Sequence, residues 1–494
     1  MRDLTIMRIT GPIKTLIQNP ILEKEVLGTG RTLKFFLFIV GFVLLACIPL
    51  LIVAAEHRSY GSNTGYELFE VIFWVQSACI ALAIPAYAST AIAGERQHRT
   101  YDLLRITILK PWEIVWGKFL AILSYIVIFL LAFLPLVAIC FLYGGTDPKL
   151  VATCYAYLLL GAATAIMFCL MVSAGSMNPI KSILVGYAFM IVYAWVWGLF
   201  AVGFLSQWTG RGFRGGAGQL SLLGIETISA YTSYAFVLSL FYIAATALMK
   251  PPSWNKTTAL RVWYVVFTLV SMVFFFIIVG TNIDTEEMAA YMLPFVGIPG
   301  IFAAVGFCSE PQTVHPRLQE KAKQASPLFQ PFLPGGIGSR FFVHVVVVIA
   351  LALSMAVASI ISTANFFEDT FWLAVGIFIY LAFCCSVSRT VRTFWDSARS
   401  RIIALLILAS LMLLPLLSLL FDEHYSHAPA IAWIDPFVAF AEFIDSPGRT
   451  SEILGRQVFL WFHVIGIVVM VAVRRARLTK IGSPAQANEA PSQT

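Results

Sequence analysis

Residues 114–142 read IVWGKFLAILSYIVIFLLAFLPLVAICFL, a run in which Lys118 is the only charged residue. A helix that spans a bilayer needs about 20 consecutive apolar residues, so this run is long enough to cross a membrane. Transmembrane β-strands alternate apolar and polar residues over about 10 positions, whereas this run is continuously apolar. The run therefore predicts a membrane-spanning helix rather than a strand.

Similar runs recur along the chain, which has 494 residues, 59% of them hydrophobic and 12% charged. A soluble domain carries about 25% charged residues, so this composition excludes an ordinary water-soluble fold. We predict an all-α membrane protein with about twelve transmembrane helices. The expected spans are 35–55, 68–92, 114–142, 150–174, 183–205, 229–249, 261–280, 288–308, 341–361, 370–387, 402–420 and 457–473.

The positions of Lys and Arg predict the orientation of these spans. If residues 1–34 are cytoplasmic and the sides alternate, most of the 33 basic residues fall in cytoplasmic segments and most of the 26 acidic residues fall outside. This is the asymmetry of the positive-inside rule. We expect a multi-pass protein of the plasma (inner) membrane with both termini cytoplasmic. No nucleic-acid partner is expected, because the basic residues are spread over several loops and are not gathered on one soluble face.

Two prolines, Pro251 and Pro252, are expected to end the sixth span and divide the chain. The prediction is two six-helix halves, 1–250 and 251–480, followed by a polar tail, 481–494, that is expected to be disordered and cytoplasmic. The eight cysteines all fall within predicted spans and show no zinc-type pairing, so neither disulfides nor a metal site is expected.

The segment between the second and third spans is the most informative polar stretch. Residues 94–107 read GERQHRTYDLLRIT, and residues 111–118 read PWEIVWGK. Gly94 is expected to give a turn where the second span ends. Thr100 can cap a short helix, on which Tyr101 and Leu104 would share an apolar face with Ile108. Such a face suggests a partner surface, although a well-capped loop with orienting charges explains the same residues equally well.

The start of the third span also has local signals. Pro111 is expected at the first helical position, and Glu113 lies at the positive end of the helix dipole. The side chain of Lys118 is expected to reach back toward the membrane surface.

A second amphipathic stretch precedes the first span. Asn19 and Pro20 are a reasonable helix start, and Leu22 lies near an apolar face while Lys24 stays polar. This pattern predicts a helix in the membrane interface. A solvated leader is the alternative.

These two stretches resemble the ABC-2 class of ABC-transporter permeases. Such permeases often show Gly-Glu-Arg after their second span, then Thr before a Leu-Leu pair, a Thr-Pro-Leu turn, an acidic residue and Gly-Lys. The matching residues are Gly94, Glu95, Arg96, Thr100, Leu103, Leu104, Thr107, Glu113, Gly117 and Lys118. The leader resembles the family in Asn19, Pro20, Leu22, Lys24 and Glu25. The departures are Ile108, where Pro is usual, and Arg99, where Gly commonly precedes Thr.

The resemblance implies a transmembrane subunit of an ABC exporter. The matching residues of 94–118, together with Tyr101, would then form a coupling loop that docks in a groove of a separate ATPase subunit. The chain contains no G-x-x-x-x-G-K-[ST] phosphate loop, so it is expected to be no enzyme itself and to hold no cofactor. ATP and Mg are expected in the partner. A homodimer or a second permease is a further possible partner, besides the lipid bilayer.

An alternative of a different class rests on one predicted outer loop that contains Asp422, Glu423, His424 and His427. These residues could bind a metal or act as acid and base, which would fit a membrane-embedded transferase acting on a lipid-linked substrate. A plain polar loop is the simpler explanation. The predicted spans lack charges away from their ends, which disfavours a proton- or sodium-coupled transporter.

Overall fold

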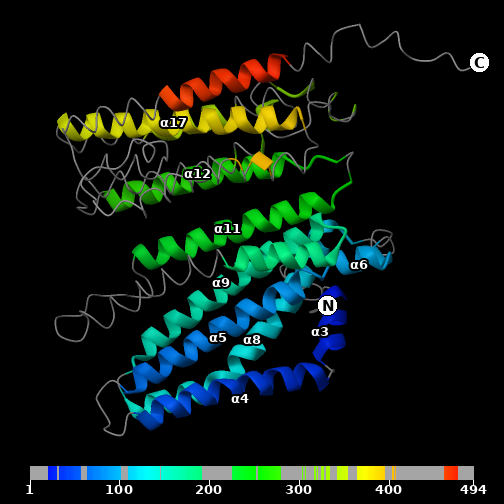
Figure 1. The fold of residues 1–494 in the computed structure, drawn as a ribbon, viewed down its shortest axis with the longest axis vertical. Helices are drawn as coiled ribbons and strands as arrows, with labels where there is room; N and C mark the ends of the chain where they lie inside the picture. Colours follow the sequence, from blue (N-terminus) through cyan, green and yellow to red (C-terminus); the bar gives the residue numbers. More distant parts are fainter. Residues whose placement is uncertain are drawn as a thin grey trace, which may run out of the picture. The chain divides into compact units, whose positions relative to one another are not determined.

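The structure is a computed structural model. It describes residues 20–30, 33–56, 64–101, 109–144, 146–191, 225–251, 254–279, 342–353, 364–394 and 461–476, with shorter pieces between 303 and 333 and between 403 and 407. These described residues are almost entirely helical and contain no strand (Figure 1). The all-α prediction is therefore confirmed for the part of the chain that the structure describes.

Four described helices are long and apolar enough to cross a membrane. They are Gly65–Gln97, Pro111–Tyr143, Pro148–Gly175 and Val375–Arg392. These helices fit a membrane protein. The predicted number of twelve spans and the orientation of the termini stay predictions, because long parts of several expected spans, and both chain ends, lie outside the described residues.

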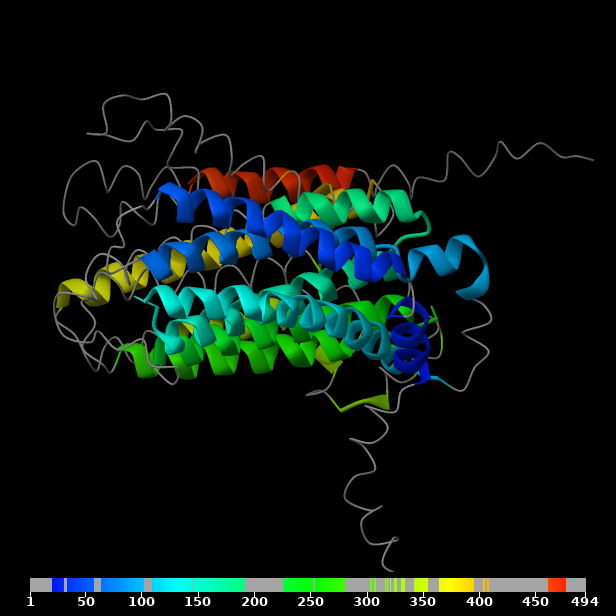
Figure 2. The same cartoon turned by 90° about the horizontal axis from the view of Figure 1, so that it is seen from below.

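The chain forms two compact units, Met1–Pro251 and Pro252–Thr494. The first contains α3 (Pro20–Gly30), α4 (Leu33–Glu56), α5 (Thr64–Ala88), α6 (Ala93–Gln97), α8 (Pro111–Tyr143), α9 (Pro148–Gly175), a helix over Pro179–Ile191, and α11 (Ile225–Met249). The helix α9 packs against α11, α5 and α8, and α4 packs against α5. Figures 1 and 2 show these long helices side by side, with α3 and α6 at one end of the bundle.

Close helix contacts in the first unit depend on glycine. A Cβ atom on Gly65 of α5 would overlap the carbonyl oxygens of Cys140 and Gly144, at the end of α8. A Cβ atom on Gly186 would lie 2.5 Å from the Ser89 hydroxyl. Small residues allow such close approach between helices in a membrane.

The second unit contains α12 (Thr258–Val279), the short 3₁₀ helix η2 (Gln330–Phe332), a helix over Phe342–Leu353, α17 (Ala364–Arg392) and a helix over 461–476. Asn255 caps α12, because its side-chain oxygen accepts hydrogen bonds from the backbone N–H groups of Thr257 and Thr258, both at 3.2 Å. The helix thus begins a few residues after Pro251, with a polar cap typical of helix starts.

Arg261, near the start of α12, is completely buried. Its Nη1 donates to the carbonyl oxygen of Leu333, and its guanidinium lies 5.6 Å from the ring centre of Phe307 and 5.8 Å from that of Phe342. A basic residue at the end of a span is ordinarily interpreted as a charge that sets the orientation of the span in the membrane. In this structure, the Arg261 side chain connects α12 to the segment 330–333.

Candidate functional site

The chain leaves α5 through a turn at residues 89–92 and enters α6 at Ala93. Hydrogen bonds from Thr90 N to the Tyr87 oxygen and from Ala91 N to the Ala88 oxygen, both at 3.3 Å, tighten the helix end. Such bonds to the third preceding residue are common at helix termini. The prediction that Gly94 makes this turn was wrong, because Gly94 lies inside α6 and has no positive φ.

The N-terminus of α6 is held by a residue of α9. The backbone N–H groups of Ile92 and Ala93 donate to the Ser173 hydroxyl at 3.0 and 2.9 Å, and all three residues are buried. The first N–H groups of a helix have no partner within the helix, and a local side chain often supplies one. Ile92, at the N-cap, cannot do so, and Ser173 does it from another helix.

We expect Ser173→Ala to leave both N–H groups buried without a partner. Each such group costs about 1–3 kcal/mol, so the loop entry should be destabilised by a measurable amount. Hydrogen exchange should become faster at the amides of Ile92 and Ala93. Ser176→Ala is the matched control, since Ser176 is only half-buried and its hydroxyl bonds within its own turn, donating to the Asn178 oxygen at 2.8 Å and accepting from the Asn178 N–H at 3.2 Å. Equal exchange in the two variants would contradict the role of Ser173.

Lys118 of α8 joins three elements. Its Nζ lies 2.8 Å from Glu95 Oε1 of α6 and 3.2 Å from Glu25 Oε1 of α3, and its side chain is only 4% exposed. Two carboxylates hold the ammonium within the protein, and the prediction that Lys118 reaches toward the membrane surface stays a prediction. Coulombic attraction is strong in such a poorly solvated place, and the pairing offsets the cost of burying the charge.

Two further contacts surround this ion cluster, defined as Lys118, Glu95 and Glu25. The Tyr125 hydroxyl donates to the backbone oxygen of Glu25 at 2.6 Å, which fastens α3 to α8 a second time. The other carboxylate oxygen of Glu95, Oε2, is buried and has no hydrogen-bond partner among the described residues. With one ammonium and two carboxylates, the cluster has a net negative charge.

The start of α8 lies where the sequence predicted it, at Pro111. The helix begins at Pro111, and the Glu113 carboxylate accepts a hydrogen bond from the backbone N–H of Lys110 at 2.8 Å. This places an acidic side chain at the positive end of the helix. Gly117 is buried in the second turn, directly before Lys118.

Beyond α6 the chain reverses at Arg99, the one non-glycine residue with positive φ in the described part of the chain (φ 58°). Thr100 then donates from its hydroxyl to the Glu95 carbonyl oxygen at 3.1 Å. The Arg96 guanidinium lies 4.7 Å from the ring centre of Tyr101. Tyr101 is buried within the core of this unit, so it packs against its own chain rather than forming part of an exposed apolar face.

The rest of the predicted coupling helix lies outside the described residues. This holds for Leu103, Leu104 and Thr107. Their part in a partner surface stays a prediction.

The positive φ of Arg99 lies where the ABC-2 pattern commonly has Gly, which makes a second test possible. A side chain in the left-handed region costs about 1–2 kcal/mol, and glycine avoids this cost. We expect Arg99→Gly to raise the stability of the segment 95–101 by about 1 kcal/mol, measured as slower hydrogen exchange. Arg99→Ala, which removes the charge but keeps Cβ, should give no such gain. Equal gains would mean that charge rather than backbone strain matters at this position.

The helix α3 runs across the direction of the long helices in both views (Figures 1 and 2). It begins at Pro20, with Leu22 half-buried and Lys24 exposed, while Glu25 points to Lys118. Asn19 lies outside the described residues. A helix that lies across a bundle of apolar helices, with a polar face, fits the predicted place in a membrane interface.

The alternative site, Asp422 to His427, also lies outside the described residues. Where the structure does describe the chain, it contains no group of three or more His, Cys, Asp or Glu side chains that could hold a metal ion.

Comparisons of the chain with protein-family models, with curated proteins and with solved structures gave no significant match. The candidate site is therefore the junction of α3, α6, α8 and α9 around the ion cluster.

Proposed function

We propose that this chain is the transmembrane permease subunit of an ABC-2-type exporter, driven by ATP hydrolysis in a separate ATPase subunit. The observation that carries the proposal is the ion cluster, in which Lys118 of a spanning helix binds Glu95 of the polar loop and Glu25 of α3. A loop that receives force from a soluble partner needs a stiff connection to the helices that move. The cluster supplies one.

The loop has two such connections. Glu95 is fastened to α8 through Lys118, and the entry to α6 is fastened to α9 through Ser173. Both helices are long and apolar enough to span the membrane. A push on the loop would therefore move two helices together rather than deform a flexible connection. Among the described residues, the buried Oε2 of Glu95 is an acceptor of the cluster that no donor reaches.

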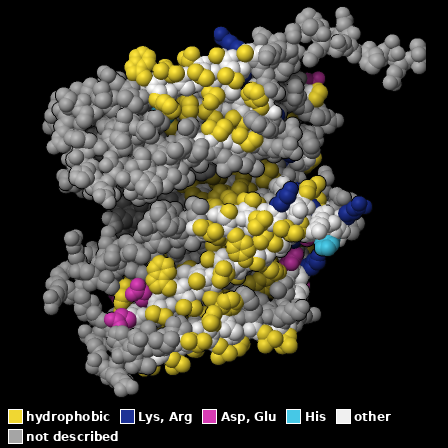
Figure 3. All heavy atoms as spheres, viewed as in Figure 1, with side chains coloured by type: hydrophobic (Ala, Val, Ile, Leu, Met, Phe, Trp, Pro, Cys, Tyr) yellow, Lys and Arg dark blue, Asp and Glu magenta, His cyan; other side chains and the backbone are white. Residues whose placement is uncertain are grey.

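The charge distribution supports a cytoplasmic place for the loop. Figure 3 shows Lys and Arg side chains, beside some acidic ones, at the end of the first unit that carries α6, and acidic side chains at its opposite end. Lys110, Lys181 and Lys250 lie at helix ends on the α6 side, whereas Glu67 and Glu70 lie near the start of α5. By the positive-inside rule the α6 end faces the cytoplasm, as expected in a plasma (inner) membrane with both termini inside.

The remaining parts of the proposal follow from this role. ATP and Mg would bind the partner ATPase, since the sequence has no phosphate loop. A second copy of the chain, or another permease, would be a further partner if one chain does not complete the pathway.

The decisive experiment changes Leu104, within the predicted coupling helix. Leu104→Asp would put a charge into an apolar contact, where an unpaired buried charge is costly. We expect a folded, membrane-inserted chain that no longer retains or stimulates the ATPase. Co-purification and ATPase assays measure the two effects separately.

Two further variants complete this test. Glu95→Ala should weaken ATPase stimulation more than co-purification, because it cuts the link to Lys118 but leaves the apolar contact. Leu318→Asp, in the Pro-rich 309–340 segment that lacks the pattern, is the control and should be mild. Wild-type behaviour of Leu104→Asp in both assays would overturn the coupling role.

A further inference from the structure

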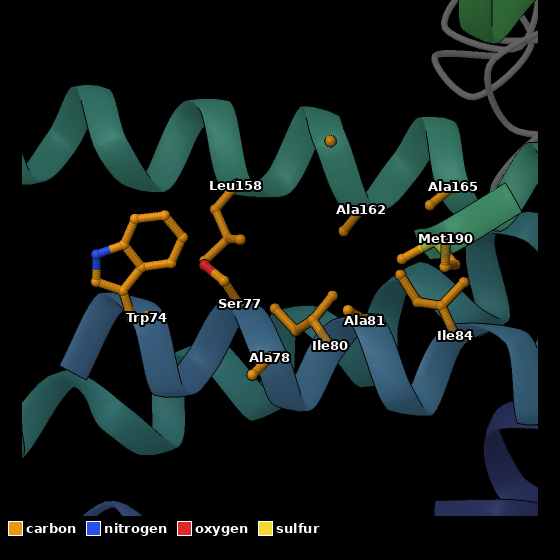
Figure 4. A pocket seen from close by; sticks show the side chains of 11 residues that line it. Trp74, Ser77, Ala78, Ile80, Ala81, Ile84, Leu158, Ala162, Ala165 and Met190 are labelled. Carbon is orange, nitrogen blue, oxygen red and sulfur yellow. The ribbon is translucent and has the colours of Figure 1, made fainter. Parts of the chain in front are cut away.

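A slot between two long helices of the first unit is not used by the proposed coupling site. It has a volume of about 220 Å³ and is lined by α5, α9 and the end of the helix Pro179–Ile191 (Figure 4). Its lining residues are Trp74, Ser77, Ala78, Ile80, Ala81, Ile84, Leu158, Gly161, Ala162, Ala165 and Met190.

The chemistry of this slot excludes polar occupants. Its lining contains no Asp, Glu, Lys, Arg or His. Its one hydroxyl, on Ser77, already donates to the Phe73 carbonyl oxygen of the same helix at 2.8 Å. An ordered water needs two to four polar partners, and the only polar side-chain groups of this lining are the Ser77 hydroxyl and the Trp74 indole N–H. A charged ligand would lose its hydration without compensation.

The shape of the slot favours a long, thin occupant. It extends along α5 from Trp74 to Ile84, ten residues apart, which corresponds to about 15 Å of helix. Between these bulky ends the facing positions are mostly small, among them Ala81 and Ala162 (Figure 4). Met190 closes one end with a flexible thioether that adapts to irregular shapes. The slot thus runs parallel to spanning helices, the direction that lipid chains take in a bilayer.

We propose that this slot binds one hydrocarbon chain of a membrane lipid. The slot is partly open, and if nothing filled it, side chains along its lining would forfeit dispersion contacts. The medium around spanning helices is hydrocarbon, which is the right chemistry to fill it. The bound chain packs between α5 and α9 and separates their facing alanines. This site is independent of any ATPase partner.

Photo-labelling tests the site. The purified full chain is reconstituted in phosphatidylethanolamine and phosphatidylglycerol vesicles that contain a phospholipid with a diazirine in the middle of one acyl chain. It is irradiated before and after transfer to detergent, and the labelled residues are mapped by mass spectrometry. We expect label on the slot-lining residues Ser77, Ala81, Leu158 and Ala162 that persists after transfer. Label on the exposed face of α4, at Leu37 and Leu44, reports ordinary surrounding lipid and should be lost.

Filling the slot is the second arm. Ala162→Leu should reduce the slot label several-fold and leave the α4 label in vesicles unchanged, and Ala81→Leu should do the same. Ala152→Leu makes the same change on an exposed position of α9 outside the slot and should change neither label. Melting of the variants in detergent confirms that they are folded. The proposal is overturned if the slot residues are still labelled in both Ala162→Leu and Ala81→Leu. It is also overturned if labelling of the slot residues never exceeds labelling of α4, or if the slot residues crosslink to another segment of the protein.

Discussion

Lys118→Met should be the most damaging substitution at the junction of α3, α6 and α8. Without the ammonium, Glu95 and Glu25 would face each other in a poorly solvated place. Removing one partner of a buried ion pair costs about 3–5 kcal/mol. The cost here should be at the lower end of that range, because the two glutamate side chains keep 19% and 27% of their exposure. Thermal unfolding and hydrogen exchange in 20–30 and 93–97 measure the loss.

Two controls make this prediction specific. Lys110→Met removes an exposed lysine just before α8 and should cost little. Adding Glu25→Gln and Glu95→Gln to Lys118→Met removes the unpaired charges and should recover part of the stability. If Lys118→Met behaves like Lys110→Met, the ion cluster does not hold these elements together.

Gly65→Ala should disrupt the packing of α5 against the end of α8. The added methyl group would overlap the backbone oxygens of Cys140 and Gly144, and the Cys140 oxygen cannot move without shifting α8. Overpacking of a tight contact typically costs about 1–3 kcal/mol, and backbone overlap belongs at the upper end of that range. Thermal unfolding of the purified protein, and its yield in the membrane, measure the effect.

Gly41→Ala is the matched control for this change. Gly41 lies in α4, and a Cβ there meets nothing within 4 Å. Alanine in an open helical position is favoured over glycine by about 1 kcal/mol, so this variant should be neutral or slightly more stable. A loss of stability in Gly41→Ala equal to that in Gly65→Ala would show that close approach to α8 is not the reason.

Local features of the fold were predictable from the sequence. Apolar runs indicated long helices, because only a helix satisfies its own backbone groups in lipid. The start of α8 at Pro111, with Glu113 in its first turn, follows from residues that are neighbours in the chain. Gly94 shows the limit even of local signals, since glycine permits a turn but does not require one.

Contacts distant in sequence could not be predicted in the same way. Lys118 pairs with Glu25, 93 positions away, and Ser173 caps amides 80 and 81 positions before it. From the sequence alone, Lys118 cannot be distinguished from other lysines near the end of a span. Ser173 likewise cannot be distinguished from other small residues in an apolar helix. Only the packing of the helices brings these groups together. The same holds for Arg261 and the carbonyl of Leu333, 72 positions apart.

The cap from Ser173 also has a consequence for how the protein is made. Ile92 and Ala93 are synthesised well before Ser173, and α8 and nearly all of α9 lie between them in the chain. Until α9 has been inserted beside α5, the two amides have no buried acceptor, and the polar loop cannot take its final shape. A nascent chain that has not yet completed α9 would therefore carry an immature loop. Insertion of α9 would decide when the loop takes its final shape during biogenesis.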